Sequence, residues 1–279
     1  MKKILTTVLT ILTFFSLNAQ STELGIAGGL SFYSGDISPD EFGLYFRDLN
    51  PAGGAFARIN FGNTFSTRLG FSMTKISGDD MDIGREDRGL NFRSQIMELA
   101  LTGELNLLHL GSKKGLQVVP FIFGGGSIFH FNPEGRLEDN WVELQPLGTE
   151  GQGLEGYDEP YNLTQFNLLA GGGIKFIISE ALTIGVEIGG RKLFTDYLDD
   201  VGYTEVNYLD VLEGNGELAA QFSNPTIKNP EEGDVNYRRG GKFDDWYYIS
   251  SVTLSYRISG GGNYYGSGGR NRNIGCPTF

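Results

Sequence analysis

Cysteine, histidine and long apolar runs are scarce in this sequence of 279 residues. Its one cysteine, Cys276, cannot close a disulfide within the chain. Two histidines, His109 and His130, leave few side chains that could act as a general base near neutral pH. After residue 20, no segment approaches the roughly 20 apolar residues that a membrane-spanning helix requires. Positive charge is also short, with 22 Lys and Arg against 34 Asp and Glu, so no nucleic-acid-binding surface is expected.

The one apolar run that does occur has the form of a secretory signal peptide. Met1–Lys3 is basic, residues 4–17 are apolar apart from Thr and Ser, and Ala19 offers a small residue at a cleavage point. We therefore expect residues 1–19 to be removed on export. Because no cysteine lies near that point, we expect no lipid anchor on the new N-terminus.

The rest of the composition is typical of an all-β protein, with 42 Gly, 20 Phe and 13 Tyr against 9 Pro. Apolar and polar residues alternate with a period of two in most of the predicted strands. The fourth is the clearest, because Leu99 and Leu101 fall on one face while Glu98 and Glu104 fall on the other. The fifth strand is apolar on both faces, which leaves its orientation open. The predicted strands cover residues 23–33, 53–61, 65–75, 94–107, 117–131, 164–178, 181–191 and 245–258.

The connections between these strands alternate strictly between short and long. Such segregation is typical of outer-membrane barrels, which have tight periplasmic turns and long outer loops. A soluble lipocalin-like barrel would turn its apolar faces inward instead, and alternation alone does not distinguish the two. The secretory signal, the loops and aromatic residues near strand ends (Phe131, Trp246, Tyr248 and Tyr256) favour the membrane form. We therefore predict an eight-stranded antiparallel transmembrane β-barrel over residues 20–258, followed by a periplasmic tail over residues 259–279.

Charged residues on the polar faces should then line the interior of the barrel. Eight strands enclose a space that side chains can fill, so we expect these charges to pair and to leave no diffusion pore. They are Arg68, Glu98, Glu104, Lys175, Glu187 and Arg191.

Few motifs point to chemistry. Residues 151–156 match the G-x-G-x-x-G dinucleotide pattern, but no strand and helix flank them, so a flexible loop is the better interpretation. His130 could meet Ser127 or an acidic loop residue in a small outer-membrane enzyme, yet nothing near it has the form of a nucleophile elbow or a metal-ligand spacing. We therefore predict no catalytic, cofactor-binding or metal-binding residues.

Four segments resemble one family, namely residues 87–92, 151–157, 185–201 and 276–279, and the most specific part is Arg191 to Asp200. In these segments the sequence is similar to the PorG-type barrels of Bacteroidetes, which belong to the type IX secretion system, and the resemblance covers essentially the whole mature chain. The resemblance implies an outer-membrane barrel without a catalytic role, associated with a periplasmic PorK–PorN ring through the lipoprotein PorK.

The resemblance and the predicted topology together place a partner-binding surface on the periplasmic side. We expect the tail to bind the PorK-like and PorN-like proteins, with Cys276 available for an intermolecular disulfide. Outer-membrane lipid is the other expected partner. Asp196, Asp199 and Asp200 should be structural, with Arg191 pairing with Asp196 or with carboxylates across the barrel. Two alternatives stay open, a lipid-modifying enzyme and a surface-binding or adhesion barrel. The predicted tail contacts are Arg270, Arg272, Cys276, Pro277 and Phe279.

Overall fold

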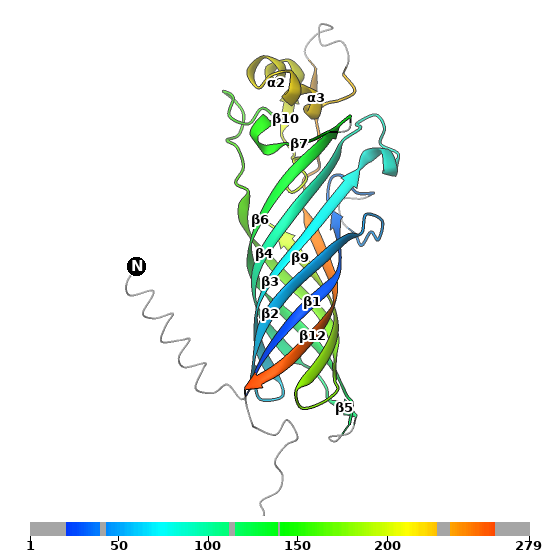
Figure 1. Ribbon diagram of the computed structural model, residues 1–279. Coiled ribbons are helices and arrows are strands. Elements are labelled where there is room, and N and C mark those ends of the chain that lie inside the picture. The colour runs from blue at the N-terminus through cyan, green and yellow to red at the C-terminus, as the bar shows by residue number, and fades with distance from the viewer. Residues whose placement is uncertain (1–20, 40–42, 112–114, 139, 228–234, 260–279) are drawn as a thin grey trace, which may run out of the picture.

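A computed structural model describes residues 21–39, 43–111, 115–138, 140–227 and 235–259. Eight long strands form a closed antiparallel barrel, in which β12 pairs with both β9 and β1 (Figure 1). The predicted signal peptide and residues 260–279 of the predicted tail lie outside the described residues. The barrel strands are β1 (Ser21–Ser34), β2 (Asn50–Phe61), β3 (Phe65–Asp79), β4 (Asn91–Asn106), β6 (Gln117–Leu137), β8 (Thr164–Ile177), β9 (Leu182–Leu193) and β12 (Trp246–Ser259).

All eight predicted strands are present, so the predicted fold class is confirmed. The main difference is β6, which continues six residues past its predicted end and forms a hairpin with β7 (Asn140–Glu143). Short elements also occur in the connections. They are the 3-10 helices η1 (Asp80–Ile83) and η2 (Gln145–Leu147), the strands β5 (Leu110–Gly111), β10 (Glu205–Asn207) and β11 (Asn236–Arg238), and the helices α2 (Tyr208–Gly214) and α3 (Glu217–Ser223).

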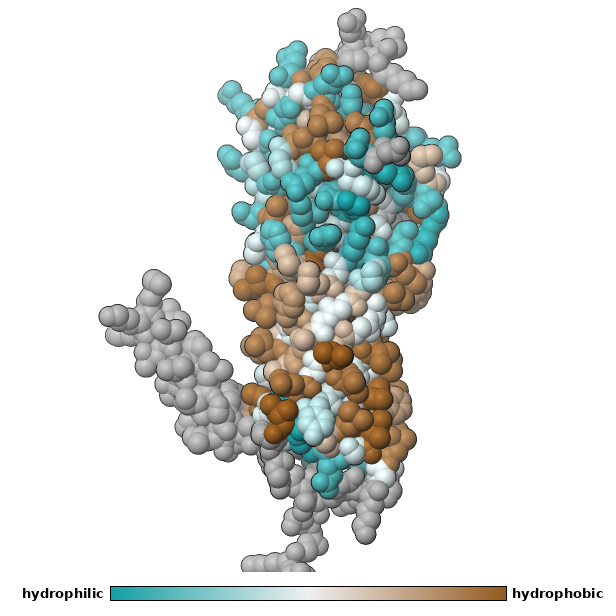
Figure 2. All heavy atoms as spheres, viewed as in Figure 1, coloured by the Kyte–Doolittle hydropathy of each residue, from teal (hydrophilic) through white to brown (hydrophobic). Residues whose placement is uncertain are grey.

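The side-chain alternation runs apolar outward and charged inward. On β4, Glu98 and Glu104 are 2% and 1% exposed, whereas Leu99 and Leu101 are 50% and 58% exposed. A lipocalin-like barrel would show the opposite arrangement, so this observation decides between the two predicted forms. On the face that Figure 2 shows, apolar residues cover the lower half of the barrel, below a largely hydrophilic upper part. The protein is therefore an outer-membrane β-barrel.

The connections follow the predicted asymmetry. At one end, three short turns join the strands at residues 62–64, 107–116 and 178–181. At the other end, the long connections gather above the barrel (Figure 1). They comprise residues 35–49, 80–90, 138–163 and 194–245. No helix in the described ranges is long and apolar enough to cross a membrane.

The orientation of β6, which the sequence left open, is settled by its aromatic residues. Phe121, Phe123, Phe129 and Phe131 point into the barrel and are at most 7% exposed, while Ile122 points outward. Phe131, one of the aromatic residues near strand ends that favoured the membrane form, therefore faces the barrel interior and not the lipid. The inner face of this strand carries rings because the barrel interior is partly apolar at its outer end.

Candidate functional site

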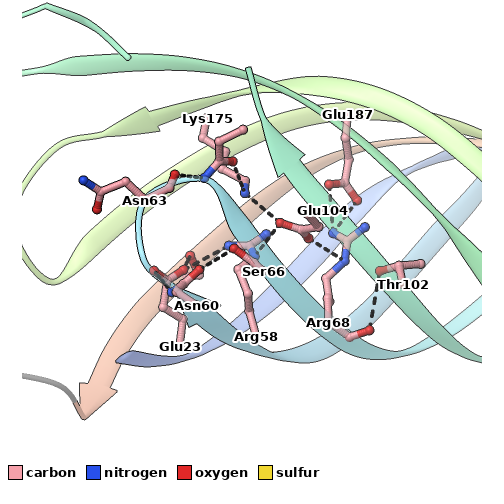
Figure 3. A network of polar contacts seen from close by, with 12 residues as sticks. Glu23, Arg58, Asn60, Asn63, Ser66, Arg68, Thr102, Glu104, Lys175 and Glu187 are labelled. Carbon is pink, nitrogen blue, oxygen red and sulfur yellow. Dashed lines mark hydrogen bonds and ion pairs between the residues drawn. The ribbon is translucent and has the colours of Figure 1, made fainter. Parts of the chain in front are cut away.

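The inner end of the barrel is filled by a network of ion pairs centred on Glu104 (Figure 3). Its carboxylate receives three cations, with Arg58 Nε at 2.9 Å, Arg68 Nε at 3.1 Å and Lys175 Nζ at 2.6 Å. Arg68 also contacts Glu187 at 2.8 Å. All these side chains are at most 10% exposed, so the pairs are shielded from solvent, and they join five different strands across the lumen.

Two further pairs extend the network toward the periplasmic rim. Arg58 Nη1 lies 3.0 Å from Glu23 Oε2, and Arg257 Nη2 lies 3.4 Å from Glu23 Oε1. Asn60 donates to the same carboxylate at 3.0 Å. The prediction did not include Glu23, Arg58 or Arg257, although all three alternate with outward-facing residues and could have been found by the same criterion. We call the seven charged side chains the inner network: Glu23, Arg58, Arg68, Glu104, Lys175, Glu187 and Arg257.

A second network lies further out and is centred on Glu98. Arg191 Nη2 is 3.2 Å from its Oε1, and the hydroxyls of Tyr247 and Ser127 donate to its Oε2 at 2.6 and 3.1 Å. Asn167 completes the set at 3.4 Å. The structure therefore places the partner of Arg191 across the barrel, and the expected alternative, a pair with Asp196, is not formed.

Aromatic rings occupy the space beside these charges. Phe56 lies under the Arg58 and Arg68 guanidinium groups, with CZ to centroid distances of 4.9 and 5.4 Å. Phe123 lies 5.2 Å from Arg68 and packs over bare glycine backbone, because a Cβ at Gly171 would come within 2.5 Å of the ring. A cavity of about 80 Å³ remains between the two networks, room for a few waters among paired charges.

Above the second network, buried apolar side chains close the outer end of the lumen. These residues come both from the inward faces of the strands and from the outer connections, so barrel and loops share one hydrophobic core. We call this cluster the apolar plug. It consists of Tyr33, Ile37, Ile76, Leu90, Phe92, Ile96, Phe129, Phe131, Leu193, Leu198, Val201, Tyr247 and Ile249.

The outer cap, defined as the described residues of 140–163 and 194–245, contains buried acidic groups. The hydroxyl oxygen of Tyr33 lies 2.5 Å from Asp199 Oδ2 and 2.9 Å from Asp245 Oδ1. A phenol has a single proton, so both contacts can be hydrogen bonds only if one carboxyl is protonated. Burial raises the pKa of Asp199 and of Asp245, which agrees with this requirement.

The other predicted acidic residues also lie in the cap. Asp200 accepts from Thr149 Oγ1 at 2.5 Å and from Tyr161 Oη at 2.7 Å, and Arg239 Nη1 lies 3.4 Å away. Asp196 is half-buried, and burial together with neighbouring carboxylates raises its pKa to about 9. These aspartates are thus part of the cap and do not line the lumen between the strands.

Two of the segments that carry the family resemblance, residues 87–92 and 185–201, meet in the apolar plug, and the residues around them make further contacts at this end of the barrel. Arg88 donates to Asp80 at 2.6 Å and to the carbonyl of Arg239 at 2.6 Å. Glu150, which precedes the glycine-rich segment, accepts from the Gly202 amide at 2.9 Å, and burial raises its pKa to about 7. Gly151, Gly153 and Gly156 all have positive φ, as expected for a loop.

The remaining candidates do not form a site among the described residues. His130 is exposed on the outward face of β6, where its Nδ1 lies 2.9 Å from Thr164 Oγ1. Ser127 points the opposite way, toward Glu98. No group of three or more potential metal ligands occurs in the described part of the chain. The predicted tail contacts, Arg270, Arg272, Cys276, Pro277 and Phe279, lie outside it.

Among solved structures, the chain is similar to Ail, the attachment invasion locus protein of Yersinia pestis, with 9% identity and a TM-score of 0.38 over 85% of this chain and 98% of that one. It is also similar to the outer membrane protein OprG from Pseudomonas aeruginosa, with 12% identity and a TM-score of 0.37 over 86% of this chain and 98% of that one. A third similar structure is the outer membrane protease OmpT from Escherichia coli, with 10% identity and a TM-score of 0.34 over 86% of this chain and 97% of that one.

No curated protein matches the sequence. A family model described as a domain of unknown function, DUF6089, matches residues 2–222. This match covers well over half of the chain and includes seven of the eight barrel strands. The protein therefore belongs to the DUF6089 family.

Proposed function

We propose that the protein is a non-catalytic component of a type IX secretion system, in which the barrel anchors or organises a periplasmic ring of PorK-like and PorN-like proteins. The observation that carries this proposal is the filled lumen. Two charge networks and the apolar plug occupy the barrel interior from one end to the other. A barrel filled in this way is suited to holding a position in the membrane rather than to passing a substrate.

The geometry around His130 gives no support to the enzyme alternative. A catalytic histidine requires a nucleophile or a proton donor within hydrogen-bonding reach and an orienting partner. Here the ring contacts a threonine hydroxyl on an exposed strand face, and Ser127 lies inside the barrel. An anchoring role requires no such arrangement.

The secretion-system assignment rests on the sequence resemblance. Its segments at residues 87–92 and 185–201 lie far apart in the sequence but share the apolar plug at the outer end of the barrel. Glu150 and Gly202, which adjoin residues 151–157 and 185–201, are joined by a hydrogen bond at the same end. Residues whose contacts depend on one another in this way are constrained together, so a resemblance spread over all three is more informative than one confined to a single strand.

Ring contacts would have to lie on the periplasmic side. The last strand, β12, ends at Ser259 at the same end of the barrel as the short turns, so the tail begins in the periplasm (Figure 1). We assign the ring contact to this tail. Arg270 and Arg272 would supply charge, Cys276 would supply a thiol for an intermolecular disulfide, and Pro277 and Phe279 would supply apolar surface.

The proposal is tested by cross-linking and pull-down of the full chain against a variant that lacks residues 262–279. We expect the full chain to recover the ring proteins and the deletion to lose them, while both remain folded in the outer membrane. As a control, deletion of residues 203–240 in the cap should leave recovery unchanged. If the tail deletion still recovers the ring proteins, the tail is not the contact, and if neither protein recovers them, the anchoring role is wrong.

The disulfide is tested separately. A non-reducing gel of cells carrying Cys276→Ser should lack a higher-mass band that the unmodified protein shows. The same band pattern for both proteins would refute an intermolecular disulfide through Cys276, without affecting the anchoring proposal.

A further inference from the structure

One tyrosine hydroxyl ties the base of the cap to the rim of the barrel. Tyr33 lies near the end of β1, and its hydroxyl oxygen contacts both Asp199, shortly after β9, and Asp245, directly before β12. The two carboxyls therefore lie near the two ends of the long connection of residues 194–245. We call these three residues the rim triad. It joins both ends of that connection to a strand that is distant from them in the sequence.

The geometry of the rim triad fits one shared proton. One oxygen of each carboxyl accepts from the backbone, Asp199 from the Val201 amide at 3.0 Å and Asp245 from the Leu198 amide at 2.9 Å. The other oxygen of each lies beside the single hydroxyl of Tyr33, which has only one proton to donate. A second proton, held by one of the two carboxyls, completes this set of hydrogen bonds.

Gly35 shows how closely the chain is built around the triad. A Cβ at this position would lie 1.9 Å from Asp245 Oδ1 and 2.1 Å from the Tyr33 hydroxyl oxygen. The bare backbone therefore packs directly on the two groups and leaves no room for a larger residue. Tyr33, Asp199 and Asp245 are each at most 4% exposed. A charge on this site cannot be screened by bulk water.

The surrounding charges do not neutralise the triad. Neither Asp199 nor Asp245 forms an ion pair with another described residue, and Asp36 and Asp196 add further carboxyls on the sides of the first connection and of the cap. Burial and these carboxyls raise the pKa of both triad aspartates. Two arginines also face the triad, but other carboxylates engage them. These contacts are Arg88 with Asp80 at 2.6 Å, and Arg239 with Asp200 at 3.4 Å and Glu150 at 3.6 Å.

A crevice of about 30 Å³ connects the triad with the outer surface. Asp199 lines its inner side, together with Ile37 and Leu90. Arg136, whose side chain is 51% exposed, and the exposed Pro225 line it as well. A proton can therefore reach or leave the triad along this crevice without prior unfolding of the barrel.

The bound proton determines whether the triad attracts or repels. With the proton in place, Tyr33 and the two carboxyls form a continuous set of hydrogen bonds. Without it, two buried like charges face each other across one hydroxyl, which is costly. We propose that the rim triad is a proton-operated latch, which keeps the base of the cap closed over the apolar plug while the shared proton is bound and releases it when the proton is lost. Release would uncover Leu198 and Val201, both fully buried in the apolar plug, while the barrel strands stay paired.

The sign of the pH dependence follows from the raised pKa values. The closed cap binds the proton more tightly than the open cap, so closure is favoured at low pH and is lost as the pH rises through the pKa of the closed triad. For one proton released, the opening equilibrium grows up to about tenfold for each pH unit.

Hydrogen exchange of the folded barrel in lipid vesicles measures this opening at the amides of residues 196–203. Rates are followed by mass spectrometry from pH 5 to pH 9 and corrected for the intrinsic rate. Asp245→Asn is the informative variant, because its amide nitrogen can donate to Tyr33 in place of the shared proton while its oxygen still accepts from the Leu198 amide. Asp199→Asn makes the same substitution on the other side. Asp244→Asn is the matched control, since this neighbouring side chain is 43% exposed.

We expect opening in the unmodified protein to grow with pH, and the slope of its logarithm against pH to be lower by about one in Asp245→Asn and in Asp199→Asn. Asp196 and Glu150 titrate in all these proteins and cancel in the comparison. Asp244→Asn should keep the slope of the unmodified protein. An unchanged slope in both triad variants would overturn the proposal, because the triad would then hold no proton that matters for closure. Equal pH-dependent opening of β4 amides would overturn it as well, because the cap would then not open separately from the barrel.

Discussion

Removing the charge of Glu104 is the sharpest test of the inner network. In the structure this network holds four cations (Arg58, Arg68, Lys175 and Arg257) and three carboxylates, a net charge of +1. Glu104→Gln changes this to +2. Arg58 and Arg68 each retain another carboxylate, but Lys175 retains only the side-chain oxygen of Asn106, at 2.9 Å.

The expected cost follows from the burial of the pair. Loss of one partner leaves a buried ammonium without a counter-charge, which destabilises a protein by about 3–5 kcal/mol. Replacing a buried pair by residues of similar volume is often close to neutral. We therefore expect Glu104→Gln to lower the free energy of unfolding by about 3–5 kcal/mol. The double variant Glu104→Gln with Lys175→Met restores the net charge to +1, and we expect it to recover most of this stability.

Urea unfolding of the barrel in lipid vesicles, followed by tryptophan fluorescence, measures both values. A matched control is Glu205→Gln in the cap, since its pair with Arg238 is about half exposed and should contribute less than about 1 kcal/mol. The reasoning is refuted if Glu104→Gln costs no more than the control, or if the double variant is as unstable as the single one.

Three further predictions concern the cap and the barrel wall. Tyr33→Phe removes the hydroxyl between two buried carboxyls, so hydrogen exchange in the cap should speed up about 5- to 150-fold, corresponding to about 1–3 kcal/mol; unchanged exchange would contradict the shared-proton interpretation. The pKa of Asp196 is raised to about 9 and that of Glu150 to about 7, so the folded cap binds protons more tightly than the unfolded chain. The stability of the cap is therefore greatest below pH 4 and falls as the pH rises toward 9. Hydrogen exchange of the cap, corrected for its intrinsic rate, should therefore be faster at pH 8.5 than at pH 5, and the opposite order would contradict it. Gly171→Val should prevent folding, because its Cβ would lie 2.2 Å from the backbone oxygen of Ile188 and 2.5 Å from the Phe123 ring, and loss of the heat-modifiable band on a gel would report this.

The barrel could be predicted from the sequence because its pattern is local. Each strand shows its two faces through alternate residues, and the lengths of the connections give the sidedness. The inward charges, such as Glu98 and Arg191, follow from the same alternation. Their partners do not, because a pairing across the lumen depends on the barrel's closure and on the stagger of its strands. Arg191 and Glu98 are 93 positions apart, and nothing in the sequence between them specifies the contact.

The cap was beyond prediction for a related reason. Tyr33 contacts residues 166 and 212 positions away, and its place between them depends on the path of two long connections. The short helices α2 and α3 pack through Val211, Ala219 and Ala220, a core too small to produce a clear helical period. The fifth predicted strand was ambiguous because its inward phenylalanines face an apolar plug, so the usual contrast between its two faces is lost.

The apolar plug determines where a function of this barrel can lie. Charged groups in the inner network are separated from the buried acids of the cap by a layer of side chains such as Phe129 and Phe131, both fully buried. A polar solute that crossed this layer would lose its hydration without gaining hydrogen bonds, which costs several kcal/mol for each polar group. The two ends of the barrel are therefore chemically separate, and any task it performs must be carried out on its surfaces. One such surface is the periplasmic rim at Ser259, where β12 ends.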